Sequence, residues 1–137
     1  MRYEGLARSE YTKEGISYEM QMVLLAQTQA ESAWLPRGTP NKAGASGITQ
    51  FIPSTANRYG VVYGTSDAAI ATQFRGQARY MKVLLNRYNG NAQLALMAYN
   101  WGEGNVDRYV RGKTRGWMPE ETRGYINKIS RTIQYYR

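Results

Sequence analysis

The chain has 137 residues, of which 42% are hydrophobic and 20% are charged, a composition typical of one globular domain with a single core. It contains neither cysteine nor histidine, which excludes disulfides, thiol nucleophiles and histidine-dependent triads and removes the commonest zinc ligands, so we expect no metal site and no cofactor. The formal net charge of +8 fits a polyanionic partner, such as nucleic acid or an acidic cell wall, and proton chemistry would have to use carboxylates, tyrosines or amines.

The N-terminal segment, MRYEGLARSEYTKEG, lacks the apolar stretch of a signal peptide. No apolar run elsewhere approaches the roughly 20 residues that a helix needs to span a bilayer. We therefore expect a single domain over residues 1–137 with no membrane span and no export signal of its own.

The first predicted helix begins near Ser17, a suitable N-cap, and runs through YEMQMVLLAQTQAES toward Trp34. Pro36 and Gly38 are expected to end it. This places Glu31 in the last turn of the helix.

Glycine-rich turns separate the remaining predicted helices. The loop PRGTPNKAGASG is long enough to be functional, and a short helix is expected from Pro53 to Gly60. The clearest helical periodicity lies over residues 67–88, with Ser66 as the N-cap. Its apolar positions are Ile70, Phe74, Met81, Leu84, Leu85 and Tyr88.

The C-terminal third is also expected to be helical. A helix over residues 92–100, capped by Asn91, is apolar almost all round, which predicts a buried, central position. The loop NWGEGN, a short helix over residues 106–110 and a final helix from Pro119 follow. No segment alternates polar and apolar residues, so we predict an all-α, or mainly α, domain with a groove.

Glu31 is the only acidic residue between Glu19 and Asp67. A carboxylate in the last turn of a helix meets the negative end of the helix dipole, and burial beside Trp34 would also disfavour the anion. Both effects raise the pKa toward the range of a general acid, as for the glutamic acid that packs against a tryptophan in lysozyme. On position alone, an exposed glutamate at a helix end is the commoner case.

Four segments extend this reading: ESAW, GASGITQFIPSTA, ALMAYNWGEGNV and PEETRGYI. In this order they resemble the successive motifs of the bacterial lytic transglycosylases of the soluble, lysozyme-like type, over about residues 15–133. Each motif is weak alone, but their order and spacing make the resemblance specific. It implies a lysozyme-like helical fold around a saccharide groove, and cleavage of the β-1,4 bond between N-acetylmuramic acid and N-acetylglucosamine in peptidoglycan.

By this resemblance Glu31 is the catalytic residue, because the catalytic glutamate of the family heads the ES dipeptide. It would protonate the glycosidic oxygen and then take the proton of the muramic C6 hydroxyl, which attacks C1 and closes a 1,6-anhydro ring. The substrate supplies the nucleophile, so this scheme requires no second carboxylate.

A muramidase that hydrolyses the same bond would need a second carboxylate, as ordinary glycosidases do. Glu103, in the predicted loop after Asn100, is the candidate, although a charge at a loop tip is the simpler interpretation. Asp67, Asp107 and Glu120 are expected to be acids in the first turns of helices, where they stabilise the positive end of the dipole.

The resemblance also assigns residues to the substrate groove. They are Gln50, Ile52, Tyr99, Asn100, Glu121 and Tyr125. The Gln50 amide suits an N-acetyl group, Gly47 would allow a close backbone approach to Glu31 or to the sugar, and the Tyr125 phenol would hold the Glu31 rotamer. Thr49 and Ile52 each stand at a position where the family usually has a methionine. These two differences concern the apolar contact of the N-acetyl subsite and not the reaction.

Aromatic residues could add stacking surfaces. Trp101 and Trp117 could stack on sugar faces, whereas Trp34 is expected to be buried beside Glu31, and Phe51 to pack in the core. Core packing is the alternative interpretation for Tyr99 and Tyr125 as well.

Two functions of other classes would fit parts of the sequence. A nucleic-acid-binding module would explain the charge of +8 and the 12 tyrosines, but the basic residues are scattered and no nucleic-acid motif is present. A catalytically silent wall-binding domain would not need Glu31.

An enzyme that acts on the cell wall in the periplasm without an export signal must be delivered by other means. We expect delivery as a component of a phage virion or by a secretion or conjugation apparatus. Other proteins of that phage or apparatus are then the candidate protein partners.

Overall fold

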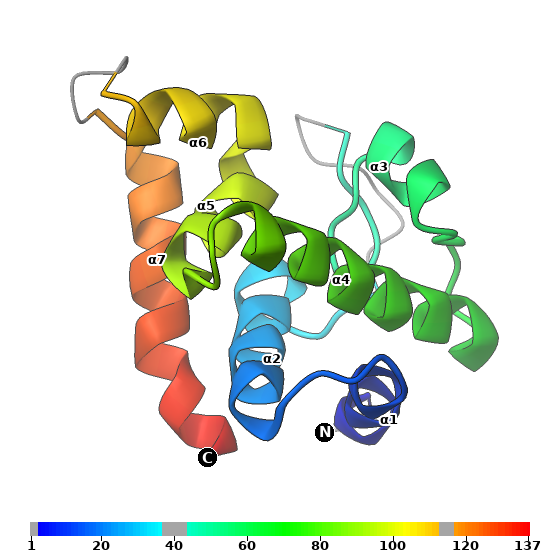
Figure 1. Ribbon diagram of the computed structural model, residues 1–137. Coiled ribbons are helices and arrows are strands. Elements are labelled where there is room, and N and C mark those ends of the chain that lie inside the picture. The colour runs from blue at the N-terminus through cyan, green and yellow to red at the C-terminus, as the bar shows by residue number, and fades with distance from the viewer. Residues whose placement is uncertain (1–2, 37–43, 113–116) are drawn as a thin grey trace.

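The computed structural model describes residues 3–36, 44–112 and 117–137, so the first part of the predicted loop, residues 37–43, lies outside the described residues. The elements are α1 (Glu4–Lys13), α2 (Tyr18–Ser32), α3 (Pro53–Arg58), α4 (Asp67–Arg87), α5 (Ala92–Trp101), α6 (Glu103–Val110), α7 (Glu120–Thr132) and the 3₁₀ helix η1 (Ile133–Tyr136) (Figure 1). Over these ranges the extended structure is limited to one isolated bridge, between Ser46 and Phe51. The all-α prediction is therefore confirmed for the part of the chain described.

None of the helices in these ranges is both long enough and apolar enough to cross a membrane.

Helix α2 lies at the centre of the molecule, with α7 along one side and α4 crossing it (Figure 1). Ser17 caps its N-terminus as predicted, accepting a hydrogen bond from a first-turn amide at 3.2 Å. The helix ends at Ser32, before the proline and glycine expected to end it, because Ala33 and Trp34 both adopt left-handed conformations with φ of 55° and 65°. Glu31 is in the last turn, as predicted.

The core is one cluster of buried residues to which α2, α4 and α5 all contribute. The predicted apolar positions of α4 are buried with the exception of Leu85, which is half-buried. Helix α5 contributes a run of buried residues, as its apolar sequence predicts. Ser66 and Asn91 cap α4 and α5 through side-chain oxygens at 3.1 and 3.0 Å from backbone amides. The caps fix where α4 and α5 begin, and the apolar faces pack the helices against one another.

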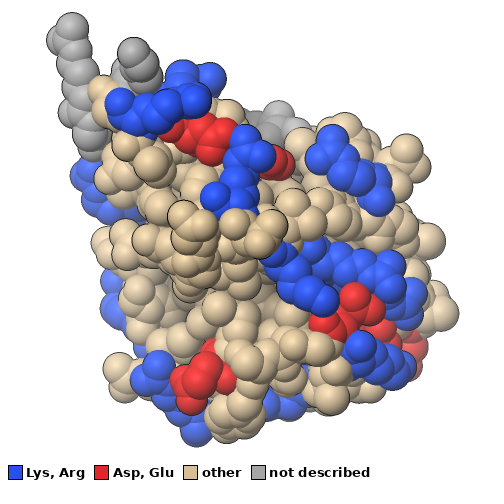
Figure 2. Space-filling model, in the orientation of Figure 1, with Lys and Arg blue, Asp and Glu red and all other residues tan. Residues whose placement is uncertain are grey.

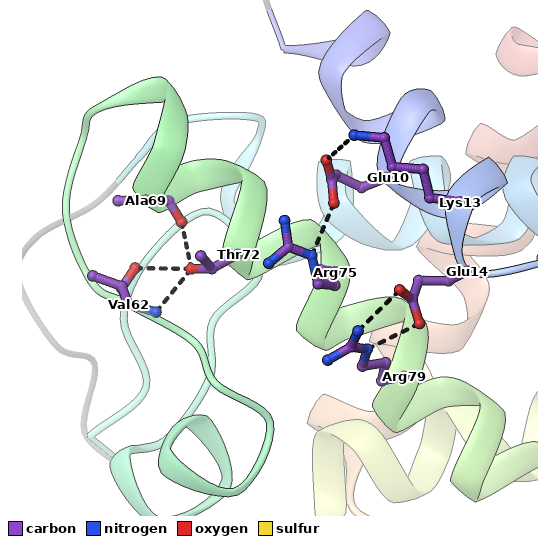
Figure 3. A network of polar contacts seen from close by, with 8 residues as sticks. All are labelled: Glu10, Lys13, Glu14, Val62, Ala69, Thr72, Arg75 and Arg79. Carbon is purple, nitrogen blue, oxygen red and sulfur yellow. Dashed lines mark hydrogen bonds and ion pairs between the residues drawn. The ribbon is translucent and has the colours of Figure 1, made fainter.

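Helix α1 is absent from the sequence-based predictions. Ala7 and Tyr11 lie on one face of it and are fully buried against α4. Ion pairs join α1 and its C-cap residue to α4: the buried Glu10 to Arg75 at 3.0 Å, and Glu14 to Arg79 at 2.9 Å (Figure 3). Apolar residues at positions 3, 6, 7 and 11 have helical spacing and were the signal available in the sequence.

Two predictions for acidic residues near α6 are wrong. The helix begins at Glu103, which is therefore a first-turn acid and not a loop-tip charge. Asp107 is not in the first turn; it accepts a hydrogen bond from Tyr88 at 2.9 Å and pairs with Arg87. Asp67 and Glu120 are in the first turns of α4 and α7, as predicted.

The segment before α3 is held against α4 by a buried glutamine. Gly47 has φ of +86°, and a Cβ atom there would lie 2.5 Å from Oε1 of Gln73. That oxygen accepts from the Ile48 amide at 2.8 Å, and the Gln73 amide nitrogen donates to the Val62 carbonyl at 3.1 Å. The sequence suggested a close backbone approach at Gly47 to Glu31 or to the sugar; the side chain that lies nearest to Gly47 is Gln73.

We predict that Gly47→Ala lowers the free energy of unfolding by about 2–4 kcal/mol, measured by urea denaturation, because it adds left-handed strain and displaces the buried Gln73. Gly60→Ala is the matched control: its φ is +69°, but nothing lies within 4 Å of the added Cβ. It should lose only the conformational part, about 1–2 kcal/mol. Equal losses in the two variants would contradict the role given to Gln73.

Candidate active site

Glu31 opens into a cavity of about 290 Å³ between the end of α2, the end of α5 and the first turns of α7. We call it the Glu31 cavity. Its walls are formed by Ala30, Glu31, Gln50, Asn100, Glu121, Gly124, Tyr125 and Lys128.

A second cavity of about 260 Å³ adjoins the first and shares Gln50 and Asn100 with it. Its other walls are Phe51, Ile52, Thr55, Tyr80, Ala98, Tyr99, Trp101 and Gly102. Because the two cavities share walls, they form one groove across the molecule. All seven residues predicted for the site line this groove: Glu31, Gln50, Asn100, Glu121 and Tyr125 in the Glu31 cavity, and Ile52 and Tyr99 in the adjoining one.

The Glu31 carboxyl group is held in a poorly solvated position. Burial raises its pKa from 4.5 to about 8, and the negative charge of Glu121 acts in the same direction. A hydrogen bond from Tyr125 opposes them, since it stabilises the carboxylate. Helix α2 has no basic residue in its last turn to offset the unfavourable end of the dipole. Glu31 is therefore protonated at neutral pH and can donate a proton to a bound ligand.

Ser32 ties the end of α2 to the segment that carries Gln50. Its hydroxyl donates to the Ile48 carbonyl at 2.6 Å. Gln50 itself has φ of 55°, and its side-chain nitrogen donates to the Gly47 carbonyl at 2.8 Å. The tight turn that results presents Gln50 between the two cavities.

Asn100 and Tyr99 lie in the last turn of α5, at the opposite wall. The Thr122 hydroxyl donates to Oδ1 of Asn100 at 2.8 Å, which orients the Asn100 amide so that its NH₂ group is the donor for a ligand. The Tyr99 hydroxyl donates to the Thr49 carbonyl at 2.8 Å, and burial together with the Glu31 charge raises the Tyr99 pKa well above its ordinary value. Tyr99 is therefore a neutral residue in the wall of the groove, and its hydroxyl proton is donated to the Thr49 carbonyl.

The position of Glu103 argues against a second acid there. Its carboxylate accepts from the Tyr80 hydroxyl at 3.2 Å and lies 3.6 Å from Arg87, and it lines neither cavity. Glu121, assigned from sequence to substrate binding, is the carboxylate that shares the cavity with Glu31.

Three residues of the Glu31 cavity were not predicted: Ala30, Gly124 and Lys128. The last two share one face of α7 with Glu121 and Tyr125, since positions 121, 124, 125 and 128 follow helical spacing. Extending the face of α7 from Glu121 would have found them.

The tryptophans divide between core and groove. Trp34 is buried as predicted, and its ring packs on Phe74 and Tyr136, with centroids 6.0 and 6.3 Å away. It is not among the residues that line the Glu31 cavity. Trp101 lines the adjoining cavity and meets Trp117 edge-on at 6.0 Å. Phe51 is in the core, as predicted, and one edge of it reaches the groove.

The basic side chains do not form one continuous surface on the face in view. Figure 2 shows Lys and Arg in several separate groups, with Asp and Glu between them. Among the acids of the molecule, Glu10 and Glu14 are paired with Arg75 and Arg79 of α4 (Figure 3). This mixed pattern differs from the basic stripe typical of nucleic-acid-binding domains.

Comparison with known proteins identifies similar chains. Residues 8–117 match the family model described as "Transglycosylase SLT domain". The membrane-bound lytic murein transglycosylase D of Escherichia coli K12 is 33% identical over 122 residues, covering 80% of this chain and 27% of that protein. The peptidoglycan transglycosylase gp16 of Escherichia phage T7 is 27% identical over 136 residues, covering 93% of this chain and 10% of that protein.

Among solved structures, the lytic transglycosylase Slt of Pseudomonas aeruginosa superposes with a TM-score of 0.76 at 23% identity, over 99% of this chain and 24% of that one. This likeness concerns the fold, and the lysozyme-like fold class expected from the sequence is confirmed. The chain spans about a quarter or less of the length of these relatives.

We predict that Glu31→Gln stabilises the fold by up to about 4 kcal/mol near pH 8 and has little effect near pH 4. The folded-state pKa of Glu31 lies above the ordinary value, so the folded protein binds the extra proton between pH 4.5 and 8 and the parent loses stability as the pH rises through that window. Urea denaturation of parent and variant across this range measures the difference.

Glu19→Gln serves as the control, because the Glu19 side chain is 76% exposed. It should change stability little at any pH. A Glu31→Gln variant that is no more stable than the parent at pH 8 would show that Glu31 does not titrate in a desolvated site.

Proposed function

Because the chain belongs to the transglycosylase SLT domain family, we propose that it is a peptidoglycan lytic transglycosylase. It would cleave the β-1,4 bond between N-acetylmuramic acid and N-acetylglucosamine and leave a 1,6-anhydro end. The observation that carries this proposal is the Glu31 carboxyl group, held with a pKa of about 8 in the wall of a groove. A carboxyl group that keeps its proton at neutral pH meets the requirement for a general acid.

Glu31 performs both proton transfers in the proposed reaction. As the bond between C1 and the glycosidic oxygen breaks, Glu31 gives its proton to that oxygen. The carboxylate then takes the proton of the muramic C6 hydroxyl while O6 bonds to C1. No water is consumed, and Glu31 ends the cycle protonated, as it began.

The groove supplies the groups that would hold the sugar. Gln50, Asn100 and Glu121 are polar groups around Glu31, suited to N-acetyl and hydroxyl groups of the substrate. Ile52, 39% exposed, and Tyr99 give the adjoining cavity an apolar wall for a sugar face. Tyr125 holds the Glu31 carboxylate by a hydrogen bond.

Hydrolysis of the same bond by Glu31 and Glu103 is not favoured, because Glu103 lines neither cavity. If a second carboxylate does act, Glu121 is the one placed to do so. A nucleic-acid-binding module is not favoured either, since the family match and the groove around Glu31 both support action on glycan strands.

The proposed place of action is the bacterial cell wall, in the periplasm. We propose delivery as part of a phage virion, or by a secretion or conjugation apparatus whose proteins would be partners. The similarity to gp16 of phage T7, over 93% of this chain, supports the virion alternative.

We predict that Glu31→Gln reduces release of soluble muropeptides from purified cell walls by roughly 10³-fold, because the amide can neither give nor take the proton. Glu103→Gln, which removes a carboxylate outside the groove, should keep at least about half of the parent rate. Mass spectrometry of the parent's products should find anhydro-muramic ends, one water lighter than reducing ends.

Glu121→Gln separates the two possible reactions. In a transglycosylase it should raise KM and leave the anhydro product unchanged. Reducing ends from the parent, together with an inactive Glu121→Gln variant, would replace the proposal with a hydrolase that uses both carboxylates.

A further inference from the structure

A chain of buried polar side chains crosses the core and ends at Glu31. The Tyr11 hydroxyl donates to Oε1 of Gln77 at 2.5 Å, and Nε2 of Gln77 donates to Oε1 of Gln27 at 2.9 Å. Nε2 of Gln27 then donates to the Tyr125 hydroxyl oxygen at 3.0 Å. Tyr125 lines the same cavity as Glu31 and is the hydrogen-bond partner of its carboxyl group. Both glutamines have no exposed surface. Helices α1, α4, α2 and α7 are thus linked through side chains to the acid.

One backbone carbonyl sets the direction of this chain. Nε2 of Gln77 also donates to the Leu24 carbonyl at 3.1 Å, and a carbonyl oxygen can only accept. The Gln77 amide must therefore present its NH₂ group on that side, where Oε1 of Gln27 lies. Gln27 in turn has its NH₂ group toward Tyr125. The Tyr125 oxygen receives an amide proton, so its own O–H is left to donate.

We propose that Gln27 and Gln77 are positioning residues that hold the Tyr125 hydroxyl as a fixed donor to one oxygen of Glu31. When Glu31 is neutral, that oxygen is occupied as an acceptor, and the acidic proton stays on the other carboxyl oxygen. When Glu31 is ionised, the same hydrogen bond stabilises the carboxylate. The inference rests on the proposed function, in which Glu31 first gives a proton and then takes one.

The alternative state that the glutamines exclude is an unproductive one. A phenol hydroxyl can donate or accept a hydrogen bond. An unconstrained Tyr125 could therefore accept a hydrogen bond from the protonated Glu31 carboxyl group in place of donating one to it. The acidic proton would then be bonded to Tyr125 and not available to a ligand in the cavity. A donor on the other side of the Tyr125 oxygen disfavours this arrangement, because hydrogen bonds in a chain polarise one another in the same direction.

Other groups around Glu31 are independent of this chain. The titratable and charged groups that face it are Tyr99 of α5 and Glu121, Tyr125 and Lys128 of α7. Of these, only Tyr125 is hydrogen-bonded to Gln27. Substitutions at the two glutamines therefore change the Tyr125 bond and leave the other charges in place.

The test is a carbon-13 NMR titration of the Glu31 carboxyl carbon in the full chain, which holds 10 Asp and Glu residues in all. Gln27→Met keeps the length of the side chain and removes the amide. We expect the Glu31 pKa to rise by about half a unit or more, because Tyr125 becomes a weaker and less constrained donor. On glycan strands, kcat should fall about threefold to tenfold with KM unchanged, and the alkaline limb of the pH profile should move upward with the pKa.

Gln21→Met is the matched control on the same helix. Gln21 is buried and donates to Thr12 and to the Ile16 carbonyl, at 3.2 and 3.0 Å, with no link to Tyr125. Its loss should lower thermal stability and leave the Glu31 titration unchanged. Tyr11→Phe should behave in the same way, because Leu24 still orients the Gln77 amide.

Gln77→Met tests the same inference if Gln27→Met does not fold, since it frees the Gln27 amide to turn over. It should shift the Glu31 pKa in the same direction. Glutamine variants that titrate like Gln21→Met would overturn the inference. A parent enzyme that yields no anhydro product would overturn the proposed function, while the NMR titration would still decide whether the glutamines act on Glu31.

Discussion

Glu31 is a carboxyl group placed where ionisation is unfavourable, at the C-terminal end of a central helix and with its pKa raised by burial. Within the described residues it has no lysine or arginine as an ion-pair partner. The groove is built around this constraint: α7 supplies Tyr125 and Glu121, α5 supplies Asn100, and the turn before α3 supplies Gln50. A chemical group that costs stability is retained because its raised pKa is what the proposed chemistry uses.

The site is held by residues that lie next to the groove residues in the sequence. Ser32 follows Glu31 and bonds the Ile48 carbonyl, and Thr122 follows Glu121 and bonds Asn100. Thr49 precedes Gln50, and its carbonyl accepts from the Tyr99 hydroxyl. Each motif therefore contains one residue that faces the groove. The residue next to it in the sequence forms a hydrogen bond to another motif. This explains how short motifs far apart in the chain make one rigid site.

The core contains packed apolar side chains and, among them, a chain of hydrogen-bonded amide side chains. These two parts of the core have different consequences. Fully buried apolar residues of α2, α4 and α5 stabilise the fold without specifying a direction. The glutamines of α2 and α4 are directional, because an amide donates from one atom and accepts at another. The direction set at the Leu24 carbonyl reaches Tyr125 through Gln77 and Gln27. A polar network in this position links the packing of the helices to the protonation of Glu31.

The sequence by itself determined the helical class, most helix boundaries, the caps at Ser17, Ser66 and Asn91, and the position of Glu31 in a last helical turn. These are local properties, set by periodicity and by short-range hydrogen bonds. The family resemblance added the residues of the groove, all of which line it. Helix α1 was missed because its low apolar content gives a weak periodic signal, and only packing on α4 makes its face evident.

Only the tertiary structure decided which neighbours each of these residues has. Trp34 packs on Phe74 and Tyr136, where the sequence suggested Glu31 as its neighbour. Gly47 meets Gln73, where the sequence suggested Glu31 or the sugar. Glu103 is the first residue of α6, and its carboxylate lies beside Tyr80 and Arg87 and lines neither cavity of the groove. Such contacts join residues tens of positions apart, and no local pattern encodes them. They depend on how the helices cross, which is set by the packing of the whole core.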